Sequence, residues 1–286
     1  MHVVFRESHG LEETDTPFDV GQDPADLVVM SFSDSDLGAF AAGWHRGRAG
    51  LPTCRLVNLV ALRHPLSVDT YVEKTLSGAK GVLIRLIGGE SYWPYGIASV
   101  QDLCRRKGIA LAVLPADGRD DPALDAVSTL PVSTLRRLQA LCDAGGAVAA
   151  QAALAQLALA AGCYAGPVIG EKTVPECGWY QPGAGVVKGP VSGGPAVAVV
   201  FYRSYLTAAD TGPVDALCAA LGERGFAVSC LFLPSLKAAG AGAFLAAALQ
   251  ELAPVAVVNA TAFSGKGSDG ASPLDGAGVP VFQVAL

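Results

Sequence analysis

The sequence has few charged residues, and positive charge is not in excess. Charged residues make up 16% of the 286 positions, and 20 Lys and Arg against 26 Asp and Glu give a formal net charge of −6. Without a basic surplus there is no broad positive field to attract a phosphate backbone, so we expect no nucleic-acid partner. Apolar residues make up 51% of the chain, which is enough to build real cores and excludes extensive disorder.

Long hydrophobic runs and a leader pattern are also missing. The most apolar stretch, 147–161, is interrupted by Gln151 and Gln156 and is too short to span a bilayer. The first residues, MHVVFRE, lack the basic segment and sustained apolar block of a secretory signal. We therefore expect no membrane span and a cytoplasmic location.

The common cysteine and glycine motifs of known sites are absent as well. The seven cysteines include no CxxC pair, which favours small buried thiols over a disulfide framework or a zinc site. Neither GxGxxG nor GxSxG occurs between a strand and a helix, which removes the usual dinucleotide and hydrolase interpretations. The run GKGS at 265–268 lacks the spacing of a phosphate loop and is expected to be a surface turn.

Short β-branched runs alternate with amphipathic stretches in the first half of the chain. The pattern predicts strands at 26–33, 56–62, 81–87 and 109–114, and helices at 34–46, 68–79 and 97–106. Strands that are apolar on both faces and alternate with helices indicate a parallel sheet covered on both sides. The first domain, 1–145, is therefore expected to be a doubly wound α/β unit of the flavodoxin or Rossmann type.

The second half repeats this alternation after an irregular stretch. Regular periodicity stops within 146–194, which we assign as a helical segment followed by a Gly- and Pro-rich linker. Further on, the pattern predicts strands at 196–202, 227–233, 256–260 and 278–285, and helices at 213–224 and 242–252. We expect a second α/β unit with a parallel sheet over 195–286, truncated at its final strand, as in a fragment of a longer protein.

Ligands of open α/β sheets bind beyond the carboxyl ends of the strands, so the residues there are the first candidates. After the strand at 81–87 come Gly88 and Gly89, which allow a close approach of the backbone. Tyr92, Trp93 and Tyr95 then offer a flat apolar wall for a large planar or macrocyclic ligand. The same rings can instead pack the loop onto the helix below, and both interpretations stay open.

Polar residues follow other predicted strands. His64 can bind a metal ion or move a proton, although a lone histidine is often only a hydrogen-bonded loop residue. Arg203 can clamp a carboxylate group of a ligand, or it can pair with a nearby acidic residue such as Asp210. Asn259 and Thr261 can hydrogen-bond polar groups of a ligand or simply cap the turn that follows.

Five separated segments stand out together. They are DLVVMSFSDSDL at 26–37, LRHPLSVD at 62–69, RLIGG with YWPYG within 85–96, FYRS at 201–204 and VNATAF at 258–263. In this order, and over nearly the whole chain, they resemble the amino-terminal part of the cobaltochelatase large subunit (CobN) and magnesium chelatase H subunit family.

The resemblance implies a part in inserting Co²⁺ into hydrogenobyrinic acid a,c-diamide during aerobic cobalamin biosynthesis. Co²⁺ is then a substrate metal, ATP with Mg²⁺ is used by the partner subunits CobS and CobT, and no cofactor is bound permanently. His64 becomes the candidate catalytic and metal-binding residue. The candidate substrate-binding residues, in a cleft between the two units, are Arg85, Gly88, Gly89, Tyr92, Trp93, Tyr95, Tyr202, Arg203, Asn259 and Thr261.

The chains of this family are several times longer, so most of the chemistry is expected outside this piece, which we expect to be inactive alone. One segment departs from the family pattern, because GWYQP at 178–182 has Gln181 where a histidine is common. That histidine could handle a metal or a proton, or only fix a turn. A magnesium chelatase H subunit that binds protoporphyrin IX and a non-catalytic, two-lobed small-molecule binding module remain as alternatives.

Overall fold

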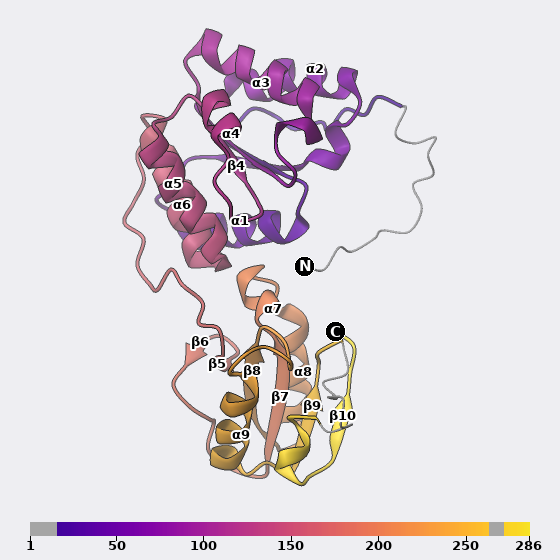
Figure 1. Ribbon diagram of the computed structural model, residues 1–286. Helices are drawn as coiled ribbons and strands as arrows, with labels where there is room; N and C mark the ends of the chain where they lie inside the picture. The colour runs from indigo at the N-terminus through magenta and orange to yellow at the C-terminus, as the bar shows by residue number, and fades with distance from the viewer. Residues whose placement is uncertain (1–15, 263–271) are drawn as a thin grey trace. The chain divides into compact units, whose positions relative to one another are not determined.

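The computed structural model describes residues 16–262 and 272–286, and its chain forms two compact units (Figure 1). The first unit ends at Thr173 and the second begins at Val174. Each unit contains its own sheet with a hydrophobic core on either face. Among the described residues, no helix combines the length and the apolar character needed to cross a membrane.

The first unit is built on a parallel sheet with the strand order β2-β1-β3-β4. Its strands are β1 (Leu27–Ser31), β2 (Cys54–Asn58), β3 (Gly81–Leu86) and β4 (Ala110–Pro115). β1, β3 and β4 are buried along their whole length, because apolar side chains on both faces of the strands meet covering helices. The predicted parallel α/β fold is confirmed for this unit.

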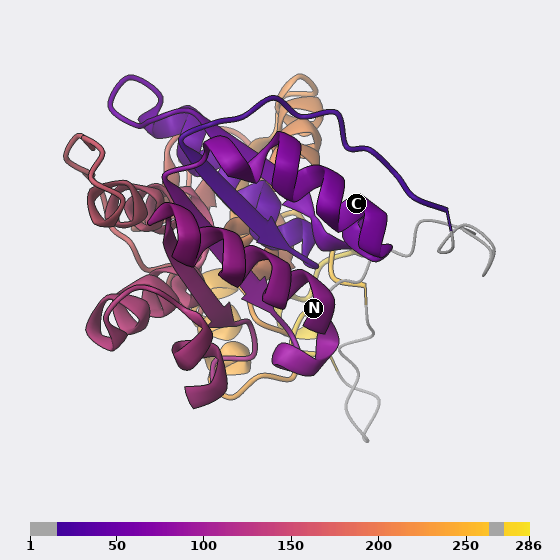
Figure 2. The same cartoon turned by 90° about the horizontal axis from the view of Figure 1, so that it is seen from above.

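Helices cover both faces of this sheet. Side chains of β1 alternate between the two cores, with Val28 and Met30 facing one and Leu27 and Val29 facing the other. The core around Val28 contains residues of α2 (Pro65–Lys74), α3 (Pro94–Lys107) and α4 (Pro122–Val127), and α2 and α3 lie side by side (Figure 2). The opposite core contains residues of α1 (Asp34–Gly47), α5 (Val132–Ala144) and α6 (Gly146–Ala160). Three short 3₁₀ helices lie in the connections of this unit. They are η2 (Leu59–Leu62) after β2, η3 (Leu76–Gly78) after α2 and η4 (Glu90–Tyr92) after β3.

Helix α6 belongs to the core of the first unit and is not a linker. Its residues Ala153, Leu154 and Leu157 are fully buried. It crosses α1 closely at Gly43, where an added Cβ would lie 2.6 Å from the backbone nitrogen of Gln151. The segment 146–194, expected to be a helical segment and an irregular linker, is thus divided between the units, and its helical part covers the first sheet.

The second unit contains a mixed sheet with the strand order β10-β9-β7-β8-β5-β6. The strands are β5 (Gly178–Gln181), β6 (Gly185–Val187), β7 (Ala196–Tyr202), β8 (Ala227–Leu233), β9 (Ala256–Asn259) and β10 (Val281–Gln283). β10, β9, β7 and β8 are parallel as predicted, whereas β5 pairs antiparallel with both β8 and β6. The expectation of a wholly parallel second sheet is corrected, because the Gly- and Pro-rich stretch supplies a hairpin that extends the sheet.

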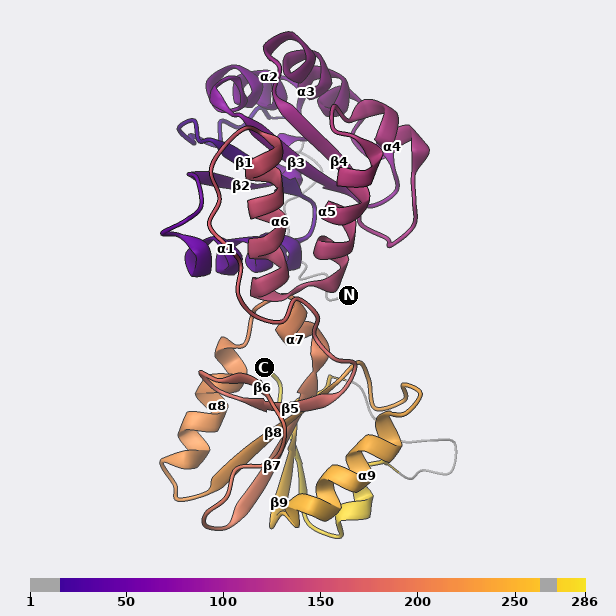
Figure 3. The ribbon, with the colours of Figure 1, turned by 90° about the vertical axis from the view of Figure 1, so that its left-hand side faces the viewer.

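Helices also flank the second sheet on both faces (Figure 3). Helix α9 (Ala241–Leu252) packs one face, while α7 (Arg203–Thr207) and α8 (Gly212–Gly222) pack the other. A short 3₁₀ helix, η5 (Asp275–Ala277), precedes β10. The predicted α/β character of this unit is confirmed.

Candidate functional site

A hollow of about 380 Å³ lies among residues that follow β1, η2 and β3 of the first unit. Its volume falls within the roughly 300 to 1,000 Å³ of small-molecule pockets. The lining residues are Phe32, Arg63, Val68, Tyr92, Trp93, Pro94 and Tyr95. The loop at 88–96, which follows a buried strand, thus contributes most of the lining, and its role in binding a ligand stays a prediction.

Two glycines set the path of that loop. Gly88 and Gly89 have φ angles of 87° and 75°, which side chains other than glycine rarely adopt. A Cβ on Gly88 would also lie 2.9 Å from the ring of Tyr92. Tyr92 is 60% exposed and meets Phe32 edge to face, with ring centroids 5.6 Å apart. The glycines therefore place the exposed ring of Tyr92 at the hollow, against the partly buried ring of Phe32.

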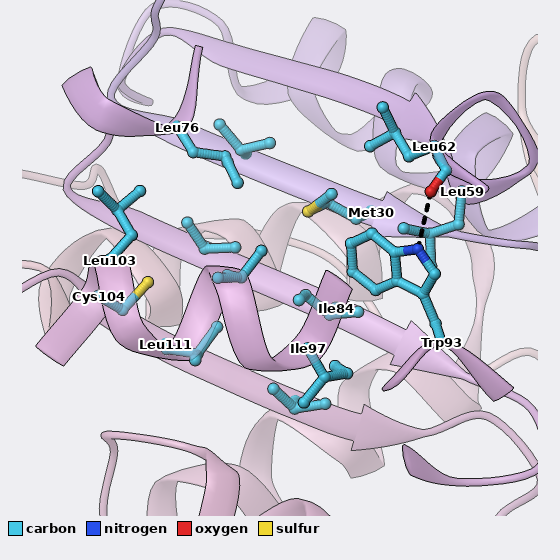
Figure 4. Packing of buried hydrophobic residues seen from close by; sticks show 14 of the residues in the cluster. Met30, Leu59, Leu62, Leu76, Ile84, Trp93, Ile97, Leu103, Cys104 and Leu111 are labelled. Atoms are coloured by element: carbon cyan, nitrogen blue, oxygen red, sulfur yellow. Dashed lines mark hydrogen bonds between the residues drawn. The ribbon is translucent and has the colours of Figure 1, made fainter. Parts of the chain in front are cut away.

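Trp93 lies in the core beneath this pair. Its side chain is 5% exposed, and its indole N–H donates a hydrogen bond of 2.9 Å to the carbonyl of Leu62 (Figure 4). Gly96, the third residue of α3, leaves room for the ring, because a Cβ there would lie 2.0 Å from Trp93 Cε2. The expected three-ring wall is corrected to an exposed Tyr92 and Tyr95 with Trp93 packed below, since a satisfied indole fills the core.

Tyr95 is the second exposed ring of the loop. It is 46% exposed and donates from its hydroxyl to Asp69 Oδ1 at 2.7 Å. That hydrogen bond, with a smaller effect of burial and of the Asp69 charge, raises the pKa of Tyr95. The phenol therefore stays protonated and its ring is tethered to α2.

Arg63 is the cation of the hollow, although it is not among the site residues predicted from the sequence. Its side chain is exposed, and it forms no hydrogen bond or ion pair with any residue in 16–262 or 272–286. A guanidinium next to exposed aromatic rings can bind a carboxylate through parallel N–H donors while a flat ligand stacks alongside. The sequence signal that could have identified Arg63 is its position after the second predicted strand, directly before His64.

His64 caps helix α2. Its Nδ1 accepts a hydrogen bond of 3.1 Å from the backbone N–H of Leu66, and Pro65 follows as the first helical residue. In the part of the chain that the structure describes, no cluster of three or more His, Cys, Asp or Glu residues has the arrangement of a metal site. The catalytic and metal-binding role of His64 stays a prediction, with Nε2 as the nitrogen left to serve it.

Arg85 is buried at the end of β3 and is occupied by acidic groups of its own chain. Its Nη2 donates to Asp143 Oδ1 at 3.0 Å, and its Nε lies 3.3 Å from Asp36 Oδ2. The guanidinium is 4% exposed and joins α1 and α5 to the sheet. The expected contact with ring carboxylates is corrected, because a buried arginine needs its counter-charges inside the fold.

In the second unit, Arg203 connects the first residues of the unit, Val174 and Pro175, to the end of β7. It donates to the carbonyls of Pro175 at 2.8 Å and Val174 at 2.7 Å, and lies 4.0 Å from Glu176. Its charged neighbour is thus Glu176 and not the expected Asp210. Tyr202, just before it, is buried at the end of β7. Two of the five N–H donors of Arg203 are thus committed to carbonyls of its own chain, and three remain for other contacts.

Asn259 and Thr261 form an internal network after β9. Asn259 Oδ1 accepts from the N–H of Thr261 at 3.1 Å and from its hydroxyl at 2.8 Å. The amide of Asn259 donates to Gln283 Oε1 at 2.8 Å, which ties the end of β9 to β10. Both residues are buried, and their polar groups perform the turn-capping role that was the simpler alternative.

Gln181 lies at the end of β5, where a tight hairpin turn leads to β6. Its carbonyl accepts from the N–H of Ala184 at 3.1 Å, and Gly183 and Gly185 have positive φ angles. The Gln181 residue is exposed, so an amide fits a position whose backbone makes the turn. The expected surface turn at 265–268 and the end of the VNATAF segment, residue 263, lie outside the described residues.

Known proteins resemble this chain over most of its length. The family model described as CobN/Magnesium Chelatase matches residues 143–286. A protein of Sinorhizobium sp called aerobic cobaltochelatase subunit CobN is 34% identical over 303 residues, which cover 99% of this chain and 24% of that protein. A protein of the same description from Pseudomonas aeruginosa is 29% identical over 277 residues, covering 92% of this chain and 22% of its own length.

A solved structure has the same fold. The catalytic subunit of cobaltochelatase from Mycobacterium tuberculosis matches with a TM-score of 0.66 at 24% identity, covering 91% of this chain and 21% of that one. This chain therefore spans about a quarter of the length of the curated relatives that it matches.

Proposed function

Because the chain belongs to the CobN/magnesium chelatase family, we propose that it forms part of a cobaltochelatase large subunit. The large subunit inserts Co²⁺ into hydrogenobyrinic acid a,c-diamide in aerobic cobalamin biosynthesis, with CobS and CobT as partners that use ATP and Mg²⁺. The observation that carries this proposal is the match of nearly the whole chain to two proteins called aerobic cobaltochelatase subunit CobN. That description favours cobalt and a corrinoid precursor over magnesium and protoporphyrin IX, and a chelatase over a binding module.

Within this role, the hollow of the first unit contacts the tetrapyrrole. Tyr92 and Tyr95 offer exposed ring surface, and Arg63 offers a guanidinium for the carboxylate groups at the periphery of the macrocycle. Contacts away from the reacting centre supply binding energy that a chelatase can use to distort the ring and to strip water from the metal ion. The hollow thus contributes to substrate binding at a distance from the metal.

The test is substrate binding to the full-length subunit that contains this segment. Quenching of tryptophan fluorescence by hydrogenobyrinic acid a,c-diamide gives the affinity, and cobalt insertion with CobS, CobT and ATP gives the activity. We expect Tyr92→Ala and Arg63→Met each to weaken binding about 10-fold, the size of one lost stacking or charged contact. Tyr164→Ala is the matched control, because Tyr164 is a 76% exposed tyrosine of the same unit outside the hollow.

Three results would overturn parts of the proposal. A wild-type subunit that binds no tetrapyrrole would remove the chelatase function. Preference for protoporphyrin IX and Mg²⁺ over the corrinoid precursor and Co²⁺ would favour the magnesium enzyme. Equal affinity of the Tyr92→Ala, Arg63→Met and Tyr164→Ala variants would leave the function intact but remove the hollow from substrate binding.

A further inference from the structure

Two cysteines of the second unit are in direct contact. Cys218 lies on α8 and Cys230 on β8, and their Sγ atoms are 2.9 Å apart. Both belong to the core between α8 and the sheet, with Cys218 7% exposed and Cys230 fully buried. No other two cysteine sulfurs within the described ranges lie within hydrogen-bond distance of each other. The contact singles out this pair among seven free thiols.

We propose that Cys218 and Cys230 form a reversible disulfide that ties α8 to β8 when the protein meets a peroxide. A disulfide bond of about 2.0 Å requires the sulfurs to approach by only about 0.9 Å. The proposal is independent of the proposed function, since neither thiol belongs to the hollow or to the network after β9.

The two thiols are not equivalent, and their difference sets the order of reaction. Either sulfur can donate in the contact of 2.9 Å, and the hydrogen bond with Cys230 lowers the pKa of Cys218 against the opposing effect of burial. The same contact, followed by burial, raises the pKa of Cys230. Cys218 is also the thiol with some exposure, so it is the nucleophile that meets the oxidant.

The chemistry balances with one peroxide per disulfide. The Cys218 thiolate attacks one oxygen of hydrogen peroxide, the O–O bond breaks, and Cys218 becomes a sulfenic acid while hydroxide leaves. The sulfur of Cys230 then attacks the sulfur of Cys218, its proton goes to the departing oxygen, and water is released. Two thiols lose two electrons in total, which reduce the peroxide to two waters, and a small dithiol reverses the bond.

A disulfide here would restrain more than one element. Asp215, one turn before Cys218 on α8, accepts a hydrogen bond of 2.6 Å from the hydroxyl of Tyr180 on β5. Fixing α8 to β8 therefore also holds the contact between α8 and the β5–β6 hairpin. We expect the oxidised second unit to unfold at a higher temperature than the reduced one.

Peptide mapping tests the proposal directly on the intact chain. Trypsin cleaves after Arg203, Arg224 and Lys237, so each of the peptides 204–224 and 225–237 contains one cysteine of the pair. After treatment with hydrogen peroxide and blocking with N-ethylmaleimide, we expect the two peptides to be linked, two hydrogens lighter than their sum. Dithiothreitol should release them. Cys218→Ala and Cys230→Ala should abolish the link, whereas Cys177→Ala, also in the second unit, should preserve it.

Two outcomes would overturn the proposal. One is sulfinic acid on Cys218 without any linked peptide. The other is unmodified Cys218 and Cys230 under conditions in which free cysteine in the same tube is oxidised. Thermal unfolding gives a second readout, because a cross-link should raise Tm by several degrees in the wild type and in Cys177→Ala but not in Cys218→Ala.

Discussion

The indole N–H of Trp93 donates to the carbonyl of Leu62, so the segments that follow β2 and β3 are joined by a buried hydrogen bond of 2.9 Å. This bond fixes the base of the hollow. Arg63 follows Leu62 directly, and Tyr92 precedes Trp93. One core contact therefore sets the spacing of the guanidinium and the exposed ring that the proposed function uses.

The contact between Trp93 and Gly96 predicts that replacing this helical glycine by alanine lowers the free energy of unfolding, although alanine favours helices. Alanine normally stabilises a helix by about 0.5 to 1 kcal/mol relative to glycine. In Gly96→Ala, however, the new methyl would meet Trp93 at 2.0 Å, so we expect a net loss of about 1 to 3 kcal/mol in the free energy of unfolding. Urea denaturation measures it. Gly242→Ala in α9, where a Cβ has open space, is the control and should lose no stability.

Breaking the buried Arg85 pairs should be among the most damaging single changes. Arg85→Met keeps an apolar side chain but leaves Asp36 and Asp143, which are 22% and 34% exposed, without their partner, and we expect a loss of about 1.5 to 3 kcal/mol. Arg106→Met removes an ion pair with Asp102 that is mostly exposed, and should change stability by no more than about 0.5 kcal/mol. Similar losses in the two variants would contradict a structural role for Arg85.

Asp26 should make stability depend on acid pH. A hydrogen bond from Thr53 and another from Lys80 hold the pKa of Asp26 below its usual value of 3.8. A lowered folded pKa means that this contribution is complete above the unfolded pKa and is lost as pH falls through the folded one. Below about pH 4, the urea concentration at the unfolding midpoint should therefore fall more steeply with decreasing pH in the wild type than in Asp26→Asn.

Thr53→Val separates this effect from general acid unfolding. It removes the largest cause of the lowered pKa of Asp26, so its acid dependence should lie between those of the wild type and Asp26→Asn. An acid profile of Thr53→Val that coincides with the wild type would refute the assignment.

His64 caps helix α2, and one substitution can separate this structural role from the predicted role in metal binding or proton transfer. Asparagine caps helices well but is a poor ligand for Co²⁺ and does not transfer protons near neutral pH. We expect His64→Ala to cost about 1 kcal/mol of stability and His64→Asn only a few tenths. If cobalt insertion by the full-length subunit falls strongly in a stable His64→Asn variant, the imidazole acts in the reaction. Unchanged activity would limit His64 to the cap.

Much of the secondary structure could be predicted because the signal is local. The runs at 196–202 and 227–233 become β7 and β8 over the same residues, since both are almost wholly apolar and rich in β-branched and aromatic residues. The parallel pairing of β1 with β2 and β3 follows from the alternation of strands and helices. The position of the aromatic loop at the carboxyl end of β3 follows from the same pattern.

The hairpin of β5 and β6 could not be predicted in this way. Its strands are short and each begins with a glycine, and β5 forms because β8 offers an edge to pair with. The assignment of α6 to the first core also depends on a distant contact, namely Gly43 of α1 against the backbone at Gln151.

By itself, the amino-acid sequence determined two α/β units, the order of nearly all their elements and the loops in which functional residues should be sought. Only the tertiary structure decided which side chains in those loops are available. Trp93, Arg85 and Arg203 have chemistry suited to a ligand, yet each is committed to groups of its own chain. The physical reason is that periodicity reports which face of an element is apolar, whereas the partner of a polar group is set by segments far away in the chain.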